Sequence, residues 1–217
     1  MASFASSNKP FFFLIDFEME KPQLYSPEEA FDLGFKFEIN GVSNFTRKKV
    51  SQQTTPFSII PVSKNRYAKA FKKVYNEIHN GNSFLLNLTF PSRIESGVSL
   101  ENLFHLAHDS YKLLQKDNLL IYSPECFIKI KGDWIYTFPM KGTFSGDLTE
   151  VKKKLKTDVK ELYEHNTIVD LMRNDLSRFA KNVQVSRFRY LKKIKTQKKE
   201  FYQTLSNTQS QIRKIGM

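Results

Sequence analysis

The 217-residue chain has a single cysteine, Cys126, and no long apolar run. One cysteine can form neither an intrachain disulfide nor a cysteine-rich metal site, and this usage is typical of a reducing cytosol. We therefore expect a cytoplasmic protein without redox chemistry. The apolar stretch 11–15 is followed at once by Asp16 and Glu18. It fits neither a signal peptide nor the ~20 apolar residues of a membrane-spanning helix, so we expect no membrane partner.

Several enzyme signatures are also missing. The sequence contains no Walker loop, no glycine fingerprint of dinucleotide-binding domains, no His-Glu-x-x-His and no Gly-x-Ser-x-Gly. These absences argue against P-loop NTPases, Rossmann dehydrogenases, zinc proteases of that type and α/β-hydrolases. The histidines are scattered, and we expect each of them to lie on a helix surface rather than to bind a metal: His79, His105, His108 and His165.

Acidic residues become scarce toward the carboxyl end. The formal charge of the chain is +12, and residues 181–217 hold ten basic side chains against one acid, Glu200. Such a cluster can bind nucleic acid electrostatically. A solvated basic face is the more ordinary interpretation, and attraction of a small anionic substrate is a third. Charge alone does not separate these readings, but we do not expect a nucleic-acid partner.

The spacing of apolar residues predicts clusters of strands with helices between them, which is typical of an α+β fold. We expect one globular unit, with an N-terminal strand region and linker over 1–60 and the main body over 61–217. Residues 43–66 are polar, carry two prolines and are predicted to form a surface connection. Strands are predicted at 11–17, 34–39, 83–90, 119–122, 126–130, 134–138 and 183–190, a hairpin loop at 131–133, and helices at 67–78, from 99 onward, and over 148–180 with at most one break.

Two charged residues in apolar surroundings are candidates for catalysis. Glu125 precedes Cys126 and Phe127, so partial desolvation would raise its pKa and let it donate a proton. Lys141 follows a predicted strand at a turn, where burial would free its amine as a nucleophile. The ordinary alternatives are an edge glutamate that faces water and a solvated turn lysine. These residues alone do not decide between the two readings.

The helix predicted to begin near Glu161 carries the third candidate group. At about 100° per residue, an apolar stripe encloses Glu164 and Asp175, so both carboxylates are predicted to point toward the core. Buried carboxylates need a partner or a cation. Glu161 and Glu164, one turn apart, suit a divalent cation such as Mg²⁺. The alternative is a structural network of Asp175 with Arg178, with Glu164 reaching solvent at the helix start.

Taken together, three segments resemble the chorismate-utilising, anthranilate synthase-like family. The resemblance covers about residues 65–205 and rests on 81–89, on 123–127 with 139–143, and on 160–177. It implies an α+β fold with mostly antiparallel sheet and helices packed outside. It also implies that Lys141 is the nucleophile at the substrate ring and Glu125 the general acid for the departing hydroxyl. The adjoining Gly142 and Thr143 would bind the substrate, and Glu164 and Glu161 would bind Mg²⁺.

The resemblance also implies a reaction and partners. Lysine at position 141 favours the branch that makes aminodeoxychorismate from chorismate and ammonia, for p-aminobenzoate and folate synthesis. A separate glutamine amidotransferase component would supply the ammonia. Isochorismate and salicylate synthases of the family also carry lysine there and remain an alternative. A non-catalytic basic remnant that binds nucleic acid is the alternative from another class.

The chain departs from the family pattern at its carboxyl end. Family members continue through a glycine-rich substrate-binding loop and a second helix with further metal-binding carboxylates, whereas this sequence ends at Met217. We therefore expect an incomplete half of the family fold, truncated at its C-terminus. Such a chain would be inactive alone and would need a polypeptide that supplies the missing half.

Overall fold

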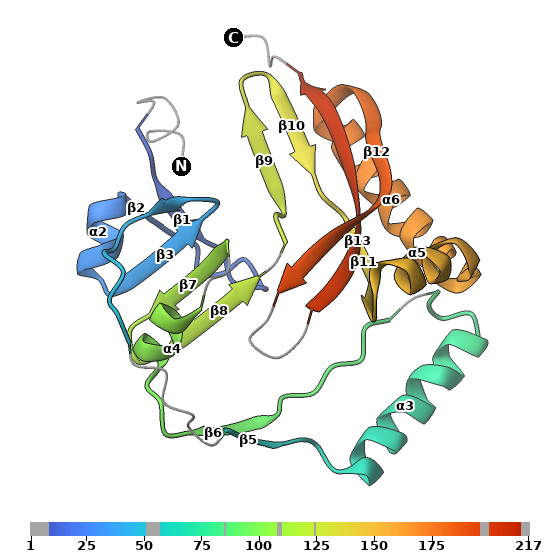
Figure 1. Ribbon diagram of the computed structural model, residues 1–217, viewed down its shortest axis with the longest axis horizontal. Coiled ribbons are helices and arrows are strands. Elements are labelled where there is room, and N and C mark those ends of the chain that lie inside the picture. The colour runs from blue at the N-terminus through green and yellow to red at the C-terminus, as the bar shows by residue number, and fades with distance from the viewer. Residues whose placement is uncertain are drawn as a thin grey trace. The chain divides into compact units, whose positions relative to one another are not determined.

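The computed structural model describes residues 9–50, 57–84, 86–107, 110–123, 125–195 and 200–213 (Figure 1). The chain forms two compact units, Met1–Tyr122 and Ser123–Met217. The boundary predicted near residue 60 falls inside the first unit. Among the helices of the described residues, none combines the length and apolar character that crossing a bilayer requires.

The first unit is built on a four-stranded sheet in the order β4-β3-β7-β8. A two-stranded ribbon of β1 and β2 and a short helix, α2, accompany it. The apolar core between them joins Phe12, Ala30, Phe35 and Phe37, and the rings of Phe12 and Phe37 stack with centroids 5.3 Å apart. The elements are β1 Phe12–Leu14, β2 Gln23–Tyr25, α2 Pro27–Asp32, β3 Phe35–Ile39, β4 Val42–Ser43, β7 Tyr111–Gln115 and β8 Leu119–Ser123.

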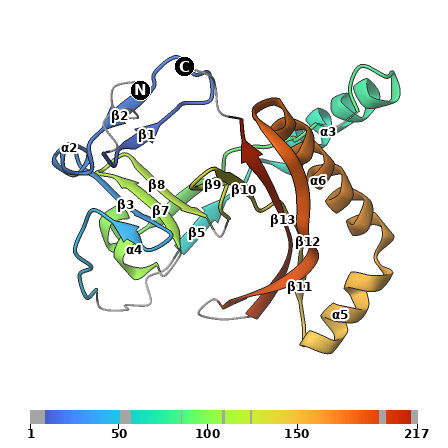
Figure 2. The same cartoon turned by 90° about the horizontal axis from the view of Figure 1, so that it is seen from above.

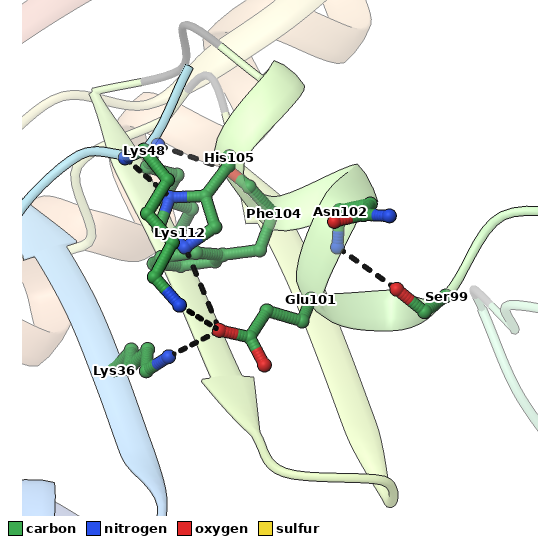
Figure 3. A network of polar contacts seen from close by, with 8 residues as sticks. All are labelled: Lys36, Lys48, Ser99, Glu101, Asn102, Phe104, His105 and Lys112. Carbon is green, nitrogen blue, oxygen red and sulfur yellow. Dashed lines mark hydrogen bonds and ion pairs between the residues drawn. The ribbon is translucent and has the colours of Figure 1, made fainter. Parts of the chain in front are cut away.

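A buried lysine fixes helix α4 (Leu100–Leu106) to this sheet. The Lys112 Nζ donates to the carbonyl oxygens of Phe104 at 3.1 Å and Ala107 at 3.0 Å, and lies 3.3 Å from Glu38 Oε2. Figure 3 shows Lys112 beneath the helix, beside the Phe104 ring. Because the carbonyls at a helix end lack partners within the helix, a cation there stabilises it.

The prediction that His105 lies on a helix surface is wrong. The residue is 4% exposed, its ring meets that of Phe45 edge-on, and its Nδ1 accepts a hydrogen bond from the Lys48 N–H (Figure 3). Burial lowers the pKa of His105, and the charge of the nearby Lys36 ammonium lowers it further. The imidazole is therefore a neutral part of the core of the first unit.

The first unit also contains a longer helix and a second ribbon. Helix α3 (Lys64–His79) confirms the predicted helix and ends before Gly81, which has φ +76°. Strands β5 (Phe57–Ile60) and β6 (Arg93–Ser96) pair antiparallel. The buried strand predicted at 83–90 is absent from the described part of that segment, where Phe84 is 98% exposed. A strand needs a neighbour for its backbone hydrogen bonds, and no described strand pairs with these residues.

The second unit is organised around its last strand, β13 (Glu200–Ile212). Strands β10 (Trp134–Thr137) and β11 (Met140–Ser145) pair in succession along one side of β13, and β12 (Ala180–Lys195) pairs along the other (Figure 1). Strand β9 (Ile128–Lys131) pairs with β10 through the predicted hairpin, whose turn holds Gly132 at φ +56°. All these pairings are antiparallel, which confirms the expected fold class.

Helices α5 (Leu148–Thr157) and α6 (Val159–Phe179) cover one face of this sheet (Figure 2). They confirm the predicted helical region and its single break. At the break, the Asp158 side chain accepts a hydrogen bond from the Glu161 N–H and caps α6. A small apolar core of Phe144, Val151 and Tyr202 holds α5 on the sheet.

The rotation of α6 about its axis differs from the prediction. Its buried residues are His165, Val169 and Leu176, whereas Leu171 is 49% and Phe179 69% exposed. The face of β13 beneath the helix carries hydroxyl side chains, all at most 2% exposed: Thr204, Ser206, Thr208 and Ser210. Of these hydroxyl groups, that of Ser206 lies 2.7 Å from His165 Nε2, and this bond turns the His165 side of the helix to the sheet and leaves Leu171 and Phe179 exposed.

Candidate active site

Lys141 lies inside β11, where the sequence predicted a turn. The residue pairs with Thr204 of β13, and Thr143 pairs with Gln203, so Gly142 is an extra residue that forms a β-bulge. A bulge changes the direction of the strand and re-aims the neighbouring side chains. The Lys141 side chain is exposed, as is Thr143. The Lys141 side chain is therefore solvated rather than buried.

Gly142 brings the backbone of the bulge against a carboxylate of α6. Its φ is +78°, in the left-handed region that favours glycine, and a Cβ built there would lie 2.6 Å from Glu161 Oε2 and 3.2 Å from the Phe144 ring. Glu161 Oε2 is buried and has no hydrogen-bond partner among the described residues. The bulge and Glu161 thus form one cluster directly beside Lys141.

Glu125 reaches the same strand from the segment before β9. The residue as a whole is exposed, but its carboxyl group hydrogen-bonds the backbone of Met140, where surrounding atoms remove part of its water. This desolvation raises the pKa of Glu125, although the Met140 hydrogen bond and the Lys141 charge act in the opposite direction. A carboxyl with a raised pKa keeps its proton to higher pH and is suited to general acid catalysis.

The two other carboxylates predicted to face inward do not. Glu164 is exposed and lies 3.6 Å from the Lys160 ammonium, one turn earlier on the helix. Asp175 is exposed as well. The prediction that both point toward the core is therefore wrong, because α6 turns His165 rather than Glu164 to the sheet.

His165 was assigned to a helix surface and is instead 1% exposed. Its Nε2 lies 2.7 Å from Ser206 Oγ, and the Phe188 ring meets the imidazole edge-on. Burial, assisted by the Arg189 charge, lowers the pKa of His165 to about 4, so the ring is neutral at pH 7. The helical spacing of Leu162, His165 and Val169 was the signal in the sequence that could have revealed this face.

A cation would find one suitable ligand in this cluster. Glu161 Oε2 is an unpaired buried oxygen, and the space that a Cβ at Gly142 would fill stays open beside it. A hard divalent cation favours such a carboxylate oxygen. No group of three acidic, histidine or cysteine side chains suited to a metal occurs in the described ranges. Of the two predicted metal ligands, Glu161 thus has a carboxylate oxygen without a partner, while Glu164 lies beside Lys160 instead.

The comparisons with known proteins agree with this architecture. A model of the chorismate binding enzyme family matches residues 15–213. The chain belongs to the chorismate-binding enzyme family. An uncharacterized PabA-like protein of Haemophilus influenzae is 45% identical over 205 residues, which are 94% of this chain and 62% of that protein. This chain thus spans less than two thirds of the length of that relative.

More distant relatives of the chorismate-binding enzyme family include characterised activities. Aminodeoxychorismate synthase component 1 of Escherichia coli is 29% identical over 170 residues, which are 73% of this chain and 33% of that protein. The crystal structure of a putative 2,3-dihydroxybenzoate-specific isochorismate synthase from Bacillus anthracis matches with a TM-score of 0.60 at 17% identity, and covers 98% of this chain and 59% of that one. At this identity the structural match shows the fold alone, and it confirms the chorismate-binding α+β fold.

Proposed function

We propose that this chain provides the lysine-bearing part of an enzyme that converts chorismate and ammonia to 4-amino-4-deoxychorismate and water. The observation that carries the proposal is that the Glu125 carboxyl, whose pKa is raised by desolvation, hydrogen-bonds the backbone of Met140, the residue before Lys141, and feels the lysine charge. The similarity to aminodeoxychorismate synthase component 1 of E. coli supports the same reaction.

The proposed steps use these two side chains in sequence. The Lys141 amine adds to the substrate ring while the ring hydroxyl departs and takes the proton of Glu125, so that water leaves. Ammonia then adds to the ring and displaces the Lys141 amine, and the proton that the new amino group releases returns to Glu125, so that both side chains are restored. Lys141 must lose its proton before the first step, and its exposed position means that a further covering element would have to desolvate it.

Gly142 and Thr143 would contact the substrate in this proposal. The bulge leaves the backbone at Gly142 without a side chain, and Thr143 presents an exposed hydroxyl group next to it. Mg²⁺ would be held by Glu161 and would offset the negative charge of a substrate carboxylate. Glu164 would join it only after its side chain leaves Lys160, which lies one turn away on the exposed side of α6.

Two polypeptide partners belong to the proposal. A glutamine amidotransferase component would supply the ammonia. A second polypeptide segment, equivalent to the part of the H. influenzae relative that this chain does not span, would complete the site. The need for completion is supported by the composition of the site, since the described residues place a single unpaired carboxylate at the bulge.

The test is a product analysis. The chain is incubated with chorismate, ammonium salt and Mg²⁺, both alone and together with the segment of the H. influenzae relative beyond the aligned region, and the products are identified by mass. We expect aminodeoxychorismate only in the mixture. Lys141→Ala and Glu125→Gln should abolish it, whereas the exposed Lys129→Ala in β9 should not. Isochorismate or salicylate as the product would replace the proposed reaction, and no product in any mixture would refute it.

A further inference from the structure

Ser206 connects four segments of the second unit at one buried point. Its backbone N–H donates to the Pro139 carbonyl oxygen at 3.0 Å, just before β11 begins. Its Oγ accepts the Arg189 N–H of β12 at 2.9 Å and lies 2.7 Å from His165 Nε2 of α6. The residue is 0% exposed. Its side chain therefore joins α6 to β12, and its backbone N–H holds the segment that leads into β11.

His165, the residue of α6 in this connection, lies one turn from Glu161 of the candidate site. Residues four apart on an α-helix lie on the same face, so Glu161 and His165 both face the sheet. The bond from His165 to Ser206 fixes both the rotation of α6 and its height along β13. Glu161 is placed by that rotation against Gly142, where its Oε2 has no partner to hold it.

Neighbouring contacts do not replace this bond. The other buried residues of α6 are Val169 and Leu176, which lie about one and about three turns beyond His165 and so farther from Glu161. Both make apolar contacts, which are non-directional and tolerate small rotations. The Asp158 cap holds the Glu161 N–H within the helix itself, whereas the hydrogen bond of His165 is a directional link from this part of α6 to the sheet.

We propose that His165 and Ser206 form a positioning clamp that holds Glu161 against the Lys141–Gly142 bulge. His165 is a positioning residue here, because it acts through Glu161 and lies away from the reacting groups. The catalytic importance of this clamp rests on the proposed function, since Glu161 is the carboxylate that would hold Mg²⁺. The position of Glu161 against the bulge does not depend on that function and is measured without metal.

The experiment uses the amide signal of Gly142 in the ¹⁵N-labelled full chain. Eight glycines make the assignment tractable. Glu161→Gln should move this signal, because it removes the charge beside the bulge. His165→Leu and Ser206→Ala should move it as well, since each breaks the clamp. His165→Gln keeps a nitrogen near the position of Nε2 and should restore the native signal.

Ser210→Ala is the matched control. Ser210 is a 0% exposed serine of the same strand, and its Oγ has no hydrogen-bond partner among the described residues, so the Gly142 signal should stay in place. If Ser210→Ala moves the Gly142 signal as far as Ser206→Ala does, the signal does not report the His165–Ser206 bond and the clamp is refuted. If Gly142 is unmoved in His165→Leu and Ser206→Ala while Glu161→Gln shifts it, the clamp is refuted. The clamp is also refuted if Glu161→Gln has no effect, because Glu161 then does not lie beside the bulge.

A titration with Mn²⁺, a paramagnetic substitute for Mg²⁺, separates this inference from the proposed function. Broadening of the Gly142 signal reports binding at Glu161. Loss of a residue that orients a metal ligand weakens binding by about tenfold or more, so His165→Leu and Ser206→Ala should need about tenfold more Mn²⁺. If wild type and Glu161→Gln broaden equally, the metal role in the proposed function fails, while the shifts without metal still decide the clamp.

Discussion

Replacing Gly142 by alanine tests how closely the bulge meets Glu161. A residue other than glycine in the left-handed region costs about 1–2 kcal/mol, and Gly142 lies there with φ +78°. The new Cβ would also lie 2.6 Å from Glu161 Oε2, so the carboxylate must move. Forcing extra volume into a packed site costs a further ~1–3 kcal/mol. We therefore expect Gly142→Ala to lower the free energy of unfolding by about 2–5 kcal/mol, the sum of these two costs.

Gly132→Ala is the matched control for this substitution. Gly132 also has a positive φ, +56°, but a Cβ there meets nothing within 4 Å, so only the backbone cost of about 1–2 kcal/mol applies. Urea unfolding followed by fluorescence suits both variants, because the single tryptophan, Trp134, lies in β10 of the second unit. The signal therefore reports the unit in which both glycines lie.

A double-mutant cycle isolates the contact. Combining Gly142→Ala with Glu161→Ala removes the colliding carboxylate, and the pair should recover about 1–3 kcal/mol relative to the sum of the single changes. Equal losses for Gly142→Ala and Gly132→Ala, or a cycle with no coupling energy, would show that Glu161 does not rest on the bulge. That result would also remove the main support for a cation at this place.

Three further predictions concern buried or desolvated charges. The pKa of Glu125 is raised in the folded state, so its contribution to stability is present at low pH and is lost as pH rises from about 4.5 through the raised value. Wild type should therefore lose stability relative to Glu125→Gln over that pH range. A constant difference in stability between the two proteins would contradict this. The pKa of His165 is lowered to about 4, so its contribution to stability is present above about pH 6.5 and is lost toward pH 4. Urea unfolding should show that wild type loses about 3 kcal/mol of stability relative to His165→Gln over this range. Parallel curves of stability against pH for the two proteins would contradict this. Lys112→Met leaves the Phe104 and Ala107 carbonyls without their donor and Glu38 with Arg47 as its remaining cation, so we expect a loss of about 1–3 kcal/mol, seen as faster hydrogen exchange in α4; unchanged exchange would contradict this.

Local signals in the sequence predicted much of the second unit. The break between α5 and α6 falls at Asp158, whose carboxylate caps the following helix, and such a cap can be recognised from a few residues. The hairpin around Gly132 also depends on short-range turn chemistry. Both features depend on neighbours in the chain. The catalytic roles of Glu125 and Lys141 stay predictions, although the structure brings the Glu125 carboxyl to the backbone of Met140, the residue before Lys141.

The features that the sequence analysis missed depend on distant partners. Lys141 was assigned to a turn because the bulge at Gly142 exists only in register with β13, some 60 residues later. The apolar stripe of α6 gave the wrong rotation, because His165 is buried by a hydrogen bond to Ser206 rather than by its own hydrophobicity. Counting apolar residues cannot detect a polar side chain that packs on a polar strand. The strand predicted at residues 83–90 was wrong for a related reason, since apolar composition does not supply a neighbouring strand.

The central position of β13 has a consequence for biosynthesis. Its partners β10, β11 and β12 all precede it in the chain, and β10 and β11 find their place only when residues 200–212 arrive. During translation, about 60 residues separate the end of the β9–β10 hairpin from β13, and about 20 separate the end of α6 from it, so both remain an open, partly apolar surface until β13 emerges from the ribosome. Pairing across such a sequence separation is slow, and exposed strands in waiting are prone to associate with one another. The nascent chain should thus depend on chaperones until its last strand closes the sheet.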